Sequence, residues 1–329
     1  MLKTAHYLFF LLLSFSLTAQ VSEEDKFISS LNIGSDLPRG ILAQRSIVLF
    51  EISYTKQELQ EVQKYFQQAG IDAVSYIDID YVLSGLEPSR MFSNYFNVRN
   101  IKFLIILSKI NDQYQIIFTE YNGTKTFGDK SKTSWKFNHA SLTELLRTVY
   151  RFAVSSERKI NLLINDVPDT KIDIAFFKGK QDERFSPDVR IFKIAIQRLG
   201  NEEDDKALAE LLRDNYNMKY DLVDPELTDA QLNDKNYRFV LRFIHTRGDV
   251  ARDILGYDVG QTAGSLPTTY FAEGQAKIKT IRAKKIIYKY YLKNTEYGNI
   301  FLGTKWDADE TWQDALKNHI AGMRSDLRF

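Results

Sequence analysis

The chain has 329 residues, 44% of them hydrophobic, which is long enough to bury a core without disulfide bonds. It contains no cysteine, and this excludes disulfides, thiol nucleophiles, thiolate metal sites and a lipidated cysteine. Lys and Arg together number 44 against 43 Asp and Glu, whereas nucleic-acid-binding proteins usually carry a basic excess. We therefore expect no nucleic-acid partner.

The N-terminus has the layout of a secretory signal peptide. Lys3 precedes an apolar run at residues 7–15, and the short stretch Ser16-Leu17-Thr18-Ala19 follows it. We expect cleavage after Ala19, which makes residues 1–19 the signal peptide and the mature protein periplasmic or secreted. No later stretch approaches the roughly 20 apolar residues that a membrane helix needs, so we expect no transmembrane span.

Residues 46–155 form the first predicted α/β domain, preceded by an N-terminal arm at residues 20–45. Thr55 and Glu58 form a capping box that predicts a helix ending at Gly70, and Ser141 with Glu144 predicts a second capped helix. The remaining runs favour the order β-α-β-α-β-β-β-α. The predicted strands are residues 46–52, 73–79, 102–110, 114–121 and 134–137.

Residues 156–170 are predicted to be a linker, and residues 171–329 a second domain of the same design. Its hairpin at residues 283–304 repeats the plan of the hairpin at residues 102–121, and an amphipathic helix follows each hairpin. The whole chain is therefore expected to be mixed α/β, with two tandem βαβαβββα-type domains.

Two further elements of the second domain are predicted from local signals. Residues 172–177 have the composition of a strand. Ser186 followed by Pro187 favours a helix start, and Phe192, Ala195, Ile196 and Leu199 lie at helical spacing before Gly200.

An exported module with this order of elements resembles the N-terminal domain of TolB-type periplasmic proteins and the globular domain of LpoB-like envelope lipoproteins. The resemblance is carried by the strand at residues 46–52, the Leu59, Val62 and Phe66 helix face, and the hairpin at residues 102–121. It implies a non-catalytic module that contacts other envelope proteins. The chain departs from these families because it has neither a β-propeller repeat nor a lipid-anchor cysteine, so no site residue is carried over.

Asp78 and Asp80 alternate at the end of a predicted strand, where both carboxylates could share one face. Paired carboxylates can divide the acid and base roles of a hydrolase when their environments differ. The same pair can equally be a solvated strand end that caps the next helix.

Motifs for other chemistry are absent from the sequence. The mature chain keeps only His139, His245 and His319, without an HExxH pair, and it has no phosphate-binding glycine loop and no nucleophile elbow. We therefore expect no metal site and no cofactor.

The connection at residues 246–269 is unusually long for a segment between two strands, and it contains four glycines. Such connections are either binding loops or flexible insertions. Tyr257 is expected to be an exposed aromatic contact within this segment. The candidate partner-binding residues are Arg247, Asp249, Arg252, Tyr257, Asp258 and Gln261.

Three classes of function remain open. The leading hypothesis is an exported, non-catalytic envelope protein that acts as a structural or protein-interaction module. The alternatives are a periplasmic hydrolase that uses carboxylates, and a carrier that binds a small ligand or a glycan between the two domains. A deep cleft with converging polar groups would favour a carrier or an enzyme, and a flat exposed patch would favour a partner surface.

Overall fold

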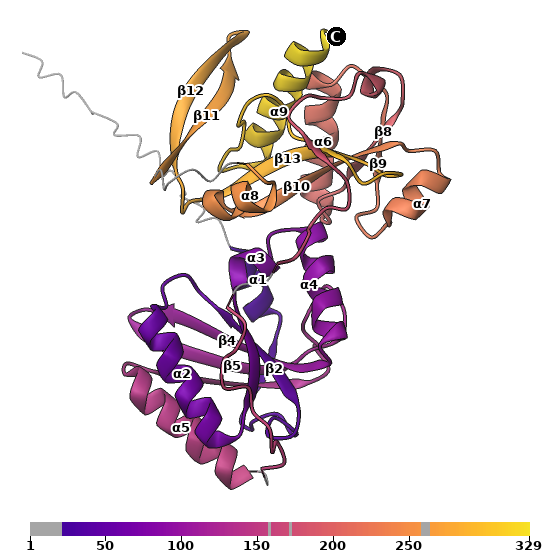
Figure 1. Ribbon diagram of the computed structural model, residues 1–329. Helices are drawn as coiled ribbons and strands as arrows, with labels where there is room; N and C mark the ends of the chain where they lie inside the picture. The colour runs from indigo at the N-terminus through magenta and orange to yellow at the C-terminus, as the bar shows by residue number, and fades with distance from the viewer. Residues whose placement is uncertain (1–21, 157–158, 171–172, 258–263) are drawn as a thin grey trace, which may run out of the picture.

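The computed structural model describes residues 22–156, 159–170, 173–257 and 264–329, so the predicted signal peptide and its cleavage site lie outside the described residues. The chain is mixed α/β, as predicted, and its strands form two six-stranded sheets and one two-stranded ribbon (Figure 1). Within the described residues, no helix is both long and apolar enough to cross a membrane.

The first sheet is built from strands between residues 32 and 139. In chain order its elements are α1 (Glu23–Ser29), β1 (Asn32–Gly34), β2 (Arg45–Phe50), α2 (Lys56–Ala69), β3 (Asp72–Asp78), α3 (Ile79–Val82), α4 (Leu86–Val98), β4 (Ile101–Ile110), β5 (Gln113–Glu120), β6 (Thr133–His139) and α5 (Leu142–Ser156). The strand β1 therefore places part of the predicted N-terminal arm in the first sheet, where it pairs with β6.

The second sheet and the ribbon are built from strands between residues 181 and 301. In chain order the elements are β7 (Gln181–Asp182), the 3-10 helix η1 (Pro187–Arg190), β8 (Ile194–Gln197), α6 (Glu202–Asn215), β9 (Tyr220–Val223), α7 (Asp229–Asp234), β10 (Phe239–Arg247), α8 (Gly248–Ile254), β11 (Ser265–Ala272), β12 (Gln275–Arg282), β13 (Ile286–Asn294), β14 (Ile300–Phe301) and α9 (Trp312–Leu327).

The two sheets have the same topology. The strand order is β1-β6-β5-β4-β2-β3 in the first sheet and β7-β14-β13-β10-β8-β9 in the second. Each neighbouring pair also has the same direction in both sheets, parallel at both edges and antiparallel in the two central pairs that form the meander. The predicted tandem design is confirmed at this level.

The predicted correspondence between the two hairpins is wrong by one strand. Residues 283–304 contain β13 and β14, which match β5 and β6 of the first sheet, whereas β4 and β5 match β10 and β13. The difference arises because α8 and the β11–β12 ribbon are inserted between β10 and β13. At the same place the first domain has only the tight turn Asn111-Asp112, with φ angles of 51° and 59°. We call residues 248–285 the insert.

The helix signals of the first domain act as predicted. Thr55 Oγ1 accepts a hydrogen bond from the Glu58 amide, and the Glu58 carboxylate accepts one from the Thr55 amide. Gly70 ends α2 with φ of 94°, a left-handed conformation that favours glycine. This capped helix packs with α5 on the outer face of the first sheet, where Phe66 and Leu146 are fully buried.

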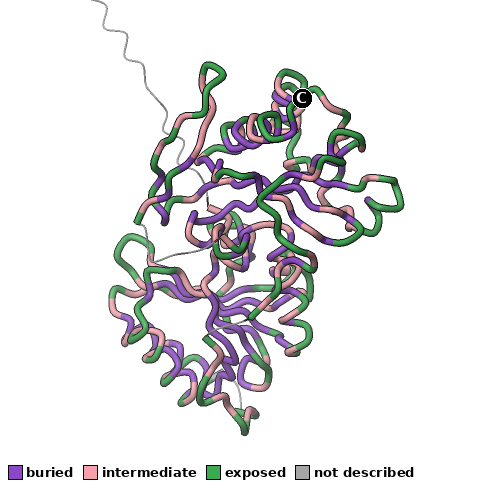
Figure 2. Tube along the Cα trace, turned by 45° about the horizontal axis from the view of Figure 1, so that its top comes forward, coloured by how far each residue is buried: buried purple, intermediate pink, exposed green. Residues whose placement is uncertain are grey.

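The inner face of the first sheet carries α1, α3 and α4, and these helices lie between the two sheets (Figure 1). The outer helices of the second domain, α6 and α9, cover the far face of the second sheet. Tyr81 of α3 packs against both the inner core of the first domain and the cluster around α8. Burial is concentrated along the sheets and this shared layer, while the tip of the β11–β12 ribbon is exposed (Figure 2).

Two predicted elements of the second domain are wrong. The segment predicted as a helix after Ser186 contains one 3-10 turn and then β8, a central parallel strand between β10 and β9. Its short apolar run fits either period, and pairing with two neighbours decides the outcome. The segment at residues 173–177 forms no strand; instead Ile174 and Phe176 pack against the inner core of the first domain.

The predicted linker is attached to the first domain. Asp169 pairs with the edge strand β3, because its carbonyl accepts from the Tyr76 amide at 2.9 Å and its amide donates to Val74 at 3.0 Å. Gln63 also donates to the Asn165 carbonyl at 2.7 Å. Residues 159–170 therefore protect a sheet edge that would otherwise have unpaired backbone groups.

Candidate ligand-binding cavity

The end of β10 lies directly against the turn around α3. The His245 amide donates to the Ser84 carbonyl at 2.8 Å, and Thr246 Oγ1 donates to the Asp80 carbonyl at 2.9 Å. Gly85 permits this approach, because a Cβ added there would lie 3.0 Å from the Phe243 carbonyl oxygen and its φ of 148° is unfavourable for other residues. Backbone contacts thus fix the second domain on the first.

Arg247, the last residue of β10, forms ion pairs with carboxylates from both domains. Its Nη2 lies 2.6 Å from Asp78 Oδ2, and its Nε lies 2.7 Å from Asp80 Oδ2 and 3.7 Å from Asp249 Oδ1. The residue is only 4% exposed, and within the described part of the chain its Nη1 has no hydrogen-bond partner. From the sequence, Arg247 and the Asp78–Asp80 pair are separate candidates, and the fold brings them together.

Asp78 has a second role that the sequence also suggested. Its Oδ1 accepts a hydrogen bond from the Asp80 amide at 3.0 Å, and Asp78 is the N-cap of α3. The capping interpretation of the pair is therefore confirmed for Asp78, although the strand end faces a buried guanidinium and is not solvated.

The carboxylates around Arg247 carry more negative charge than the single guanidinium offsets. Burial, opposed by Arg247 and assisted by the neighbouring Asp78 and Asp249 carboxylates, raises the pKa of Asp80 to about 6. Burial raises the pKa of Asp78 too. Glu24 of α1 has its pKa raised to about 8 by burial and by Glu51 and Asp80. These raised values indicate that burial and the neighbouring carboxylates both disfavour additional negative charge here.

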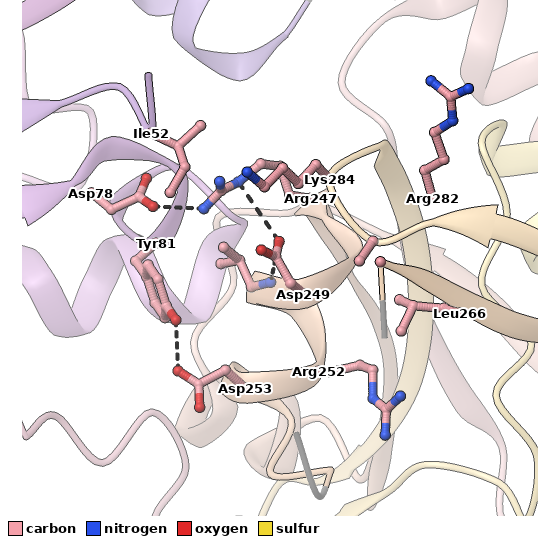
Figure 3. Close-up of a pocket in the computed structure, with 13 residues that line it drawn as sticks. Ile52, Asp78, Tyr81, Arg247, Asp249, Arg252, Asp253, Leu266, Arg282 and Lys284 are labelled. Carbon is pink, nitrogen blue, oxygen red and sulfur yellow. Dashed lines mark hydrogen bonds and ion pairs between the residues drawn. The ribbon is translucent and has the colours of Figure 1, made fainter. Parts of the chain in front are cut away.

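A cavity of about 740 Å³ opens beside Arg247, between the two domains (Figure 3). The first domain contributes Ile52 just after β2, Asp78 at the end of β3 and Tyr81 in α3. The carboxyl ends of parallel strands are the usual place for ligands in α/β sheets. The Tyr81 hydroxyl donates to Asp253 Oδ2 at 2.7 Å, which closes one side of the cavity.

The opposite wall consists of Arg247 and the insert. Helix α8 contributes Asp249, Val250, Arg252 and Asp253. The base of the ribbon contributes Gly264, Leu266, Arg282, Ala283 and Lys284. The first domain has only a tight turn at the corresponding position. This wall of the cavity is therefore formed by residues that have no counterpart in the first domain.

The structure separates the candidate residues of the long connection. Arg247, Asp249 and Arg252 line the cavity, whereas Asp258 and Gln261 lie outside the described residues. The connection is not a loop throughout, because it contains α8 and the start of β11.

Tyr257 is not the exposed contact that the sequence suggested. Its ring packs edge-on against Trp306 with centroids 5.1 Å apart, and its hydroxyl is buried. Apolar spacing in α8 explains this outcome: Val250, Ala251 and Ile254 anchor the helix in the core and bring the residues that follow toward it.

A second group of charges, which is not among the residues predicted from the sequence, also joins the two domains. Glu87 of α4 contacts Arg242 of β10 and, at 2.7 Å, Lys293 of β13. Asp229 of α7 lies 2.9 Å from Arg242 and 2.6 Å from Lys293. Arg242 is 2% exposed. An arginine between Leu241 and Phe243, within the apolar first part of β10, was the available signal.

The geometry suits binding better than bond cleavage. Asp78 and Asp80 both form ion pairs with Arg247, so neither carboxylate is placed as a free acid or base. Among the residues that the structure describes, no group of three or more His, Asp or Glu side chains is arranged to hold a metal ion.

Comparisons with known proteins do not extend this description. No protein-family model matches the chain, and no curated protein matches it at a significant level.

Proposed function

We propose that this protein is a non-catalytic binding protein that holds a small ligand in the cavity between its two α/β domains. The observation that carries the proposal is the cavity of about 740 Å³ at the carboxyl ends of β2 and β3, closed on its other side by the insert. Its size lies within the range of small-molecule sites, about 300–1,000 Å³. Its lining combines apolar side chains with a few converging charged groups.

Location and partners enter the proposal from the sequence. The predicted signal peptide supports a periplasmic or secreted protein, in which a ligand carrier would act outside the cytoplasm. The resemblance to TolB-type and LpoB-like modules supports contact with other envelope proteins as a further part of this role.

A hydrolase is less well supported. Such an enzyme would need one carboxylate that gives a proton and another that accepts one, and the two environments would have to differ. Arg247 instead binds both Asp78 and Asp80 within 2.7 Å, which orders them as partners of one cation.

The test is native mass spectrometry of the full chain after exposure to a small-molecule extract, with Ala283→Trp as the blocked variant. Ala283 is buried in the cavity wall, and an indole there would fill the space. The wild type should retain a small molecule that Ala283→Trp does not. Retention by both proteins would place the ligand elsewhere, and retention by neither would contradict the proposal.

The blocked variant needs a control for folding. Lys284→Trp places the same indole at an exposed residue of the cavity lining. Lys285→Trp places it at the next residue, which is also exposed but does not line the cavity. Both variants should have circular dichroism spectra like that of the wild type. Lys284→Trp should weaken retention, and Lys285→Trp should leave it unchanged.

A protein-interaction module is the second candidate function, and one observation favours it. Leu162 and Leu163 are 91% and 90% exposed, and Ile160 beside them is 62% exposed. Adjacent exposed aliphatic side chains of this kind are typical of contact sites. Crosslinking in the native envelope should capture a partner in the wild type and lose it in a Leu162→Ser, Leu163→Ser double variant. If the double variant captures the partner as well as the wild type does, the exposed leucines do not form the contact site.

A further inference from the structure

We propose that the cavity binds a zwitterionic group, in which an ammonium and a carboxylate are adjacent as in an α-amino acid, with the ligand carboxylate on Arg247 and the ammonium between Asp78 and Asp249. This inference rests on the proposed binding function and deepens it by naming the ligand class. It follows from a buried donor without a partner, on a side chain that lines the cavity together with two carboxylate acceptors.

The unpartnered donor is Arg247 Nη1. The side chain is 5% exposed, and its Nη2 and Nε lie near carboxylates, while Nη1 has no hydrogen-bond partner among the described residues. A buried donor that lacks a partner is unfavourable, so an acceptor from a ligand would stabilise it. A guanidinium is also the side chain best suited to hold a carboxylate, through its planar fork of donors.

The acceptors lie on both sides of this guanidinium. Asp78 comes from the first domain and Asp249 from the insert, and both line the cavity. Asp249 is the more accessible of the two, with its side chain 37% exposed against 12% for Asp78. In Figure 3 the Arg247 side chain extends from the second domain toward Asp78, with Asp249 beside it. A ligand ammonium in this position would meet carboxylates from both domains at once.

Charge balance distinguishes a zwitterion from a simple acid or a simple amine. An acid would satisfy Arg247 Nη1, but its charge would be repelled by Asp78, Asp80 and Asp249, three carboxylates that already form ion pairs with this one guanidinium. An amine would offset that excess, but it would leave Nη1 unpartnered. A zwitterion satisfies both requirements and adds no net charge.

The rest of the cavity sets a looser requirement on the ligand. Tyr81, Val250 and Leu266 offer apolar surface, and the exposed side chains of Arg282 and Lys284 lie at the ribbon base. The volume of about 740 Å³ is larger than one amino acid needs, so the zwitterionic group can belong to a larger molecule such as a short peptide or an amino-acid conjugate.

The test is isothermal titration calorimetry of the full chain with matched triples of probes. The first triple is leucine, isopentylamine and 4-methylpentanoic acid, which share one side chain and differ only in the charged groups. Equivalent sets of three probes are titrated for the L- and D-enantiomers of the other common amino acids. A further set is based on the molecule released in native mass spectrometry. At least one zwitterion should bind roughly tenfold or more tightly than both its amine and its acid, since each analogue forfeits one charged contact.

Two variants assign the contacts. Asp249→Asn keeps the shape of a half-exposed side chain and should reduce zwitterion and amine affinity together, while acid affinity rises. Arg247→Gln should reduce zwitterion affinity to that of the amine. Because Arg247 is buried, its variant is interpreted only if its circular dichroism spectrum is that of the wild type; Asp249→Asn tests the proposal independently. Asp188→Asn, an exposed carboxylate on η1, is the control and should change nothing.

The outcomes separate this inference from the function on which it rests. If a ligand is retained by the wild type and lost in Ala283→Trp, but binds no better than its amine or its acid, the zwitterion inference is overturned and the binding function stands. If Asp249→Asn leaves every affinity unchanged, the inference is again overturned. If the wild type retains no ligand at all and no probe binds, both fail.

Discussion

Glu24 offers the sharpest test of the electrostatics between the domains. It belongs to the first turn of α1, and its pKa is raised from 4.5 to about 8 by burial and by the carboxylates of Glu51, Asp80, Asp25 and Asp78. Glutamine has nearly the same shape and cannot ionise. Glu24→Gln should therefore stabilise the protein at pH values where Glu24 is ionised in the unfolded chain but protonated in the folded protein.

The sign and size follow from proton linkage. A carboxyl group with a raised pKa binds its proton more tightly in the folded state, so its contribution to stability falls as pH rises from about 4.5 to about 8 and then levels off. For each pH unit above the pKa of Glu24 in the unfolded chain, the wild type loses about 1.4 kcal/mol of unfolding free energy relative to Glu24→Gln. Glu24→Gln should thus gain up to roughly 3 kcal/mol at pH 7 and less than about 1 kcal/mol at pH 5.

The assay is urea denaturation of both proteins at pH 5, 7 and 8.5, followed by circular dichroism. The advantage of Glu24→Gln should grow with pH across this series. Asp25→Asn is the matched control, because Asp25 lies in the same turn but is exposed. An advantage that is constant with pH, or that is equal for Asp25→Asn, would refute the proposed excess of buried negative charge.

Further predictions concern the interface and the candidate surfaces. Glu87→Gln should cost roughly 3 kcal/mol of unfolding free energy because it leaves buried cations with one partner fewer, and a loss below about 1 kcal/mol in urea titration would count against the network. Gly85→Ala should cost more than about 1 kcal/mol, whereas Gly264→Ala, with no atom within 4 Å of the new Cβ, should be nearly neutral; equal melting temperatures would contradict this. Tyr257→Ala should lower stability by roughly 2 kcal/mol through loss of packing on Trp306, and an unchanged melting curve would restore the surface interpretation.

The sequence predicted the first domain well because its local signals agree with its tertiary contacts. The Thr55–Glu58 capping box, Gly70 and the hairpin around Asn111-Asp112 all specify the structure within a few residues of themselves. Helix α2 and the strands β4 and β5 therefore begin and end close to their predicted positions.

The second domain was harder because its central strand depends on distant partners. Strand β8 has only four residues, and its pairing with β10 and β9, not its own pattern, makes it a strand. The insert concealed the match between the two domains, since it separates β10 from β13, which pair along their whole length.

The candidate site was predicted in parts and not as a whole. Arg247 and the Asp78–Asp80 pair were both identified, but nothing in a single sequence indicates that residues so far apart in the chain are in contact. Glu24 was missed because it occurs in an acidic stretch that is typical of an exposed helix start, and only the packing of α1 between the sheets shields it partly from solvent.

Hydrogen exchange with and without the retained small molecule tests the central claim most directly. A ligand between the domains should slow exchange at two separate places, the amides of α8 and those of the Asp78–Val82 turn, because both walls of the cavity would be held together. Amides of α2 and α5 on the outer face should be unaffected. Protection confined to those outer helices, or to only one wall of the cavity, would contradict a binding site between the two domains.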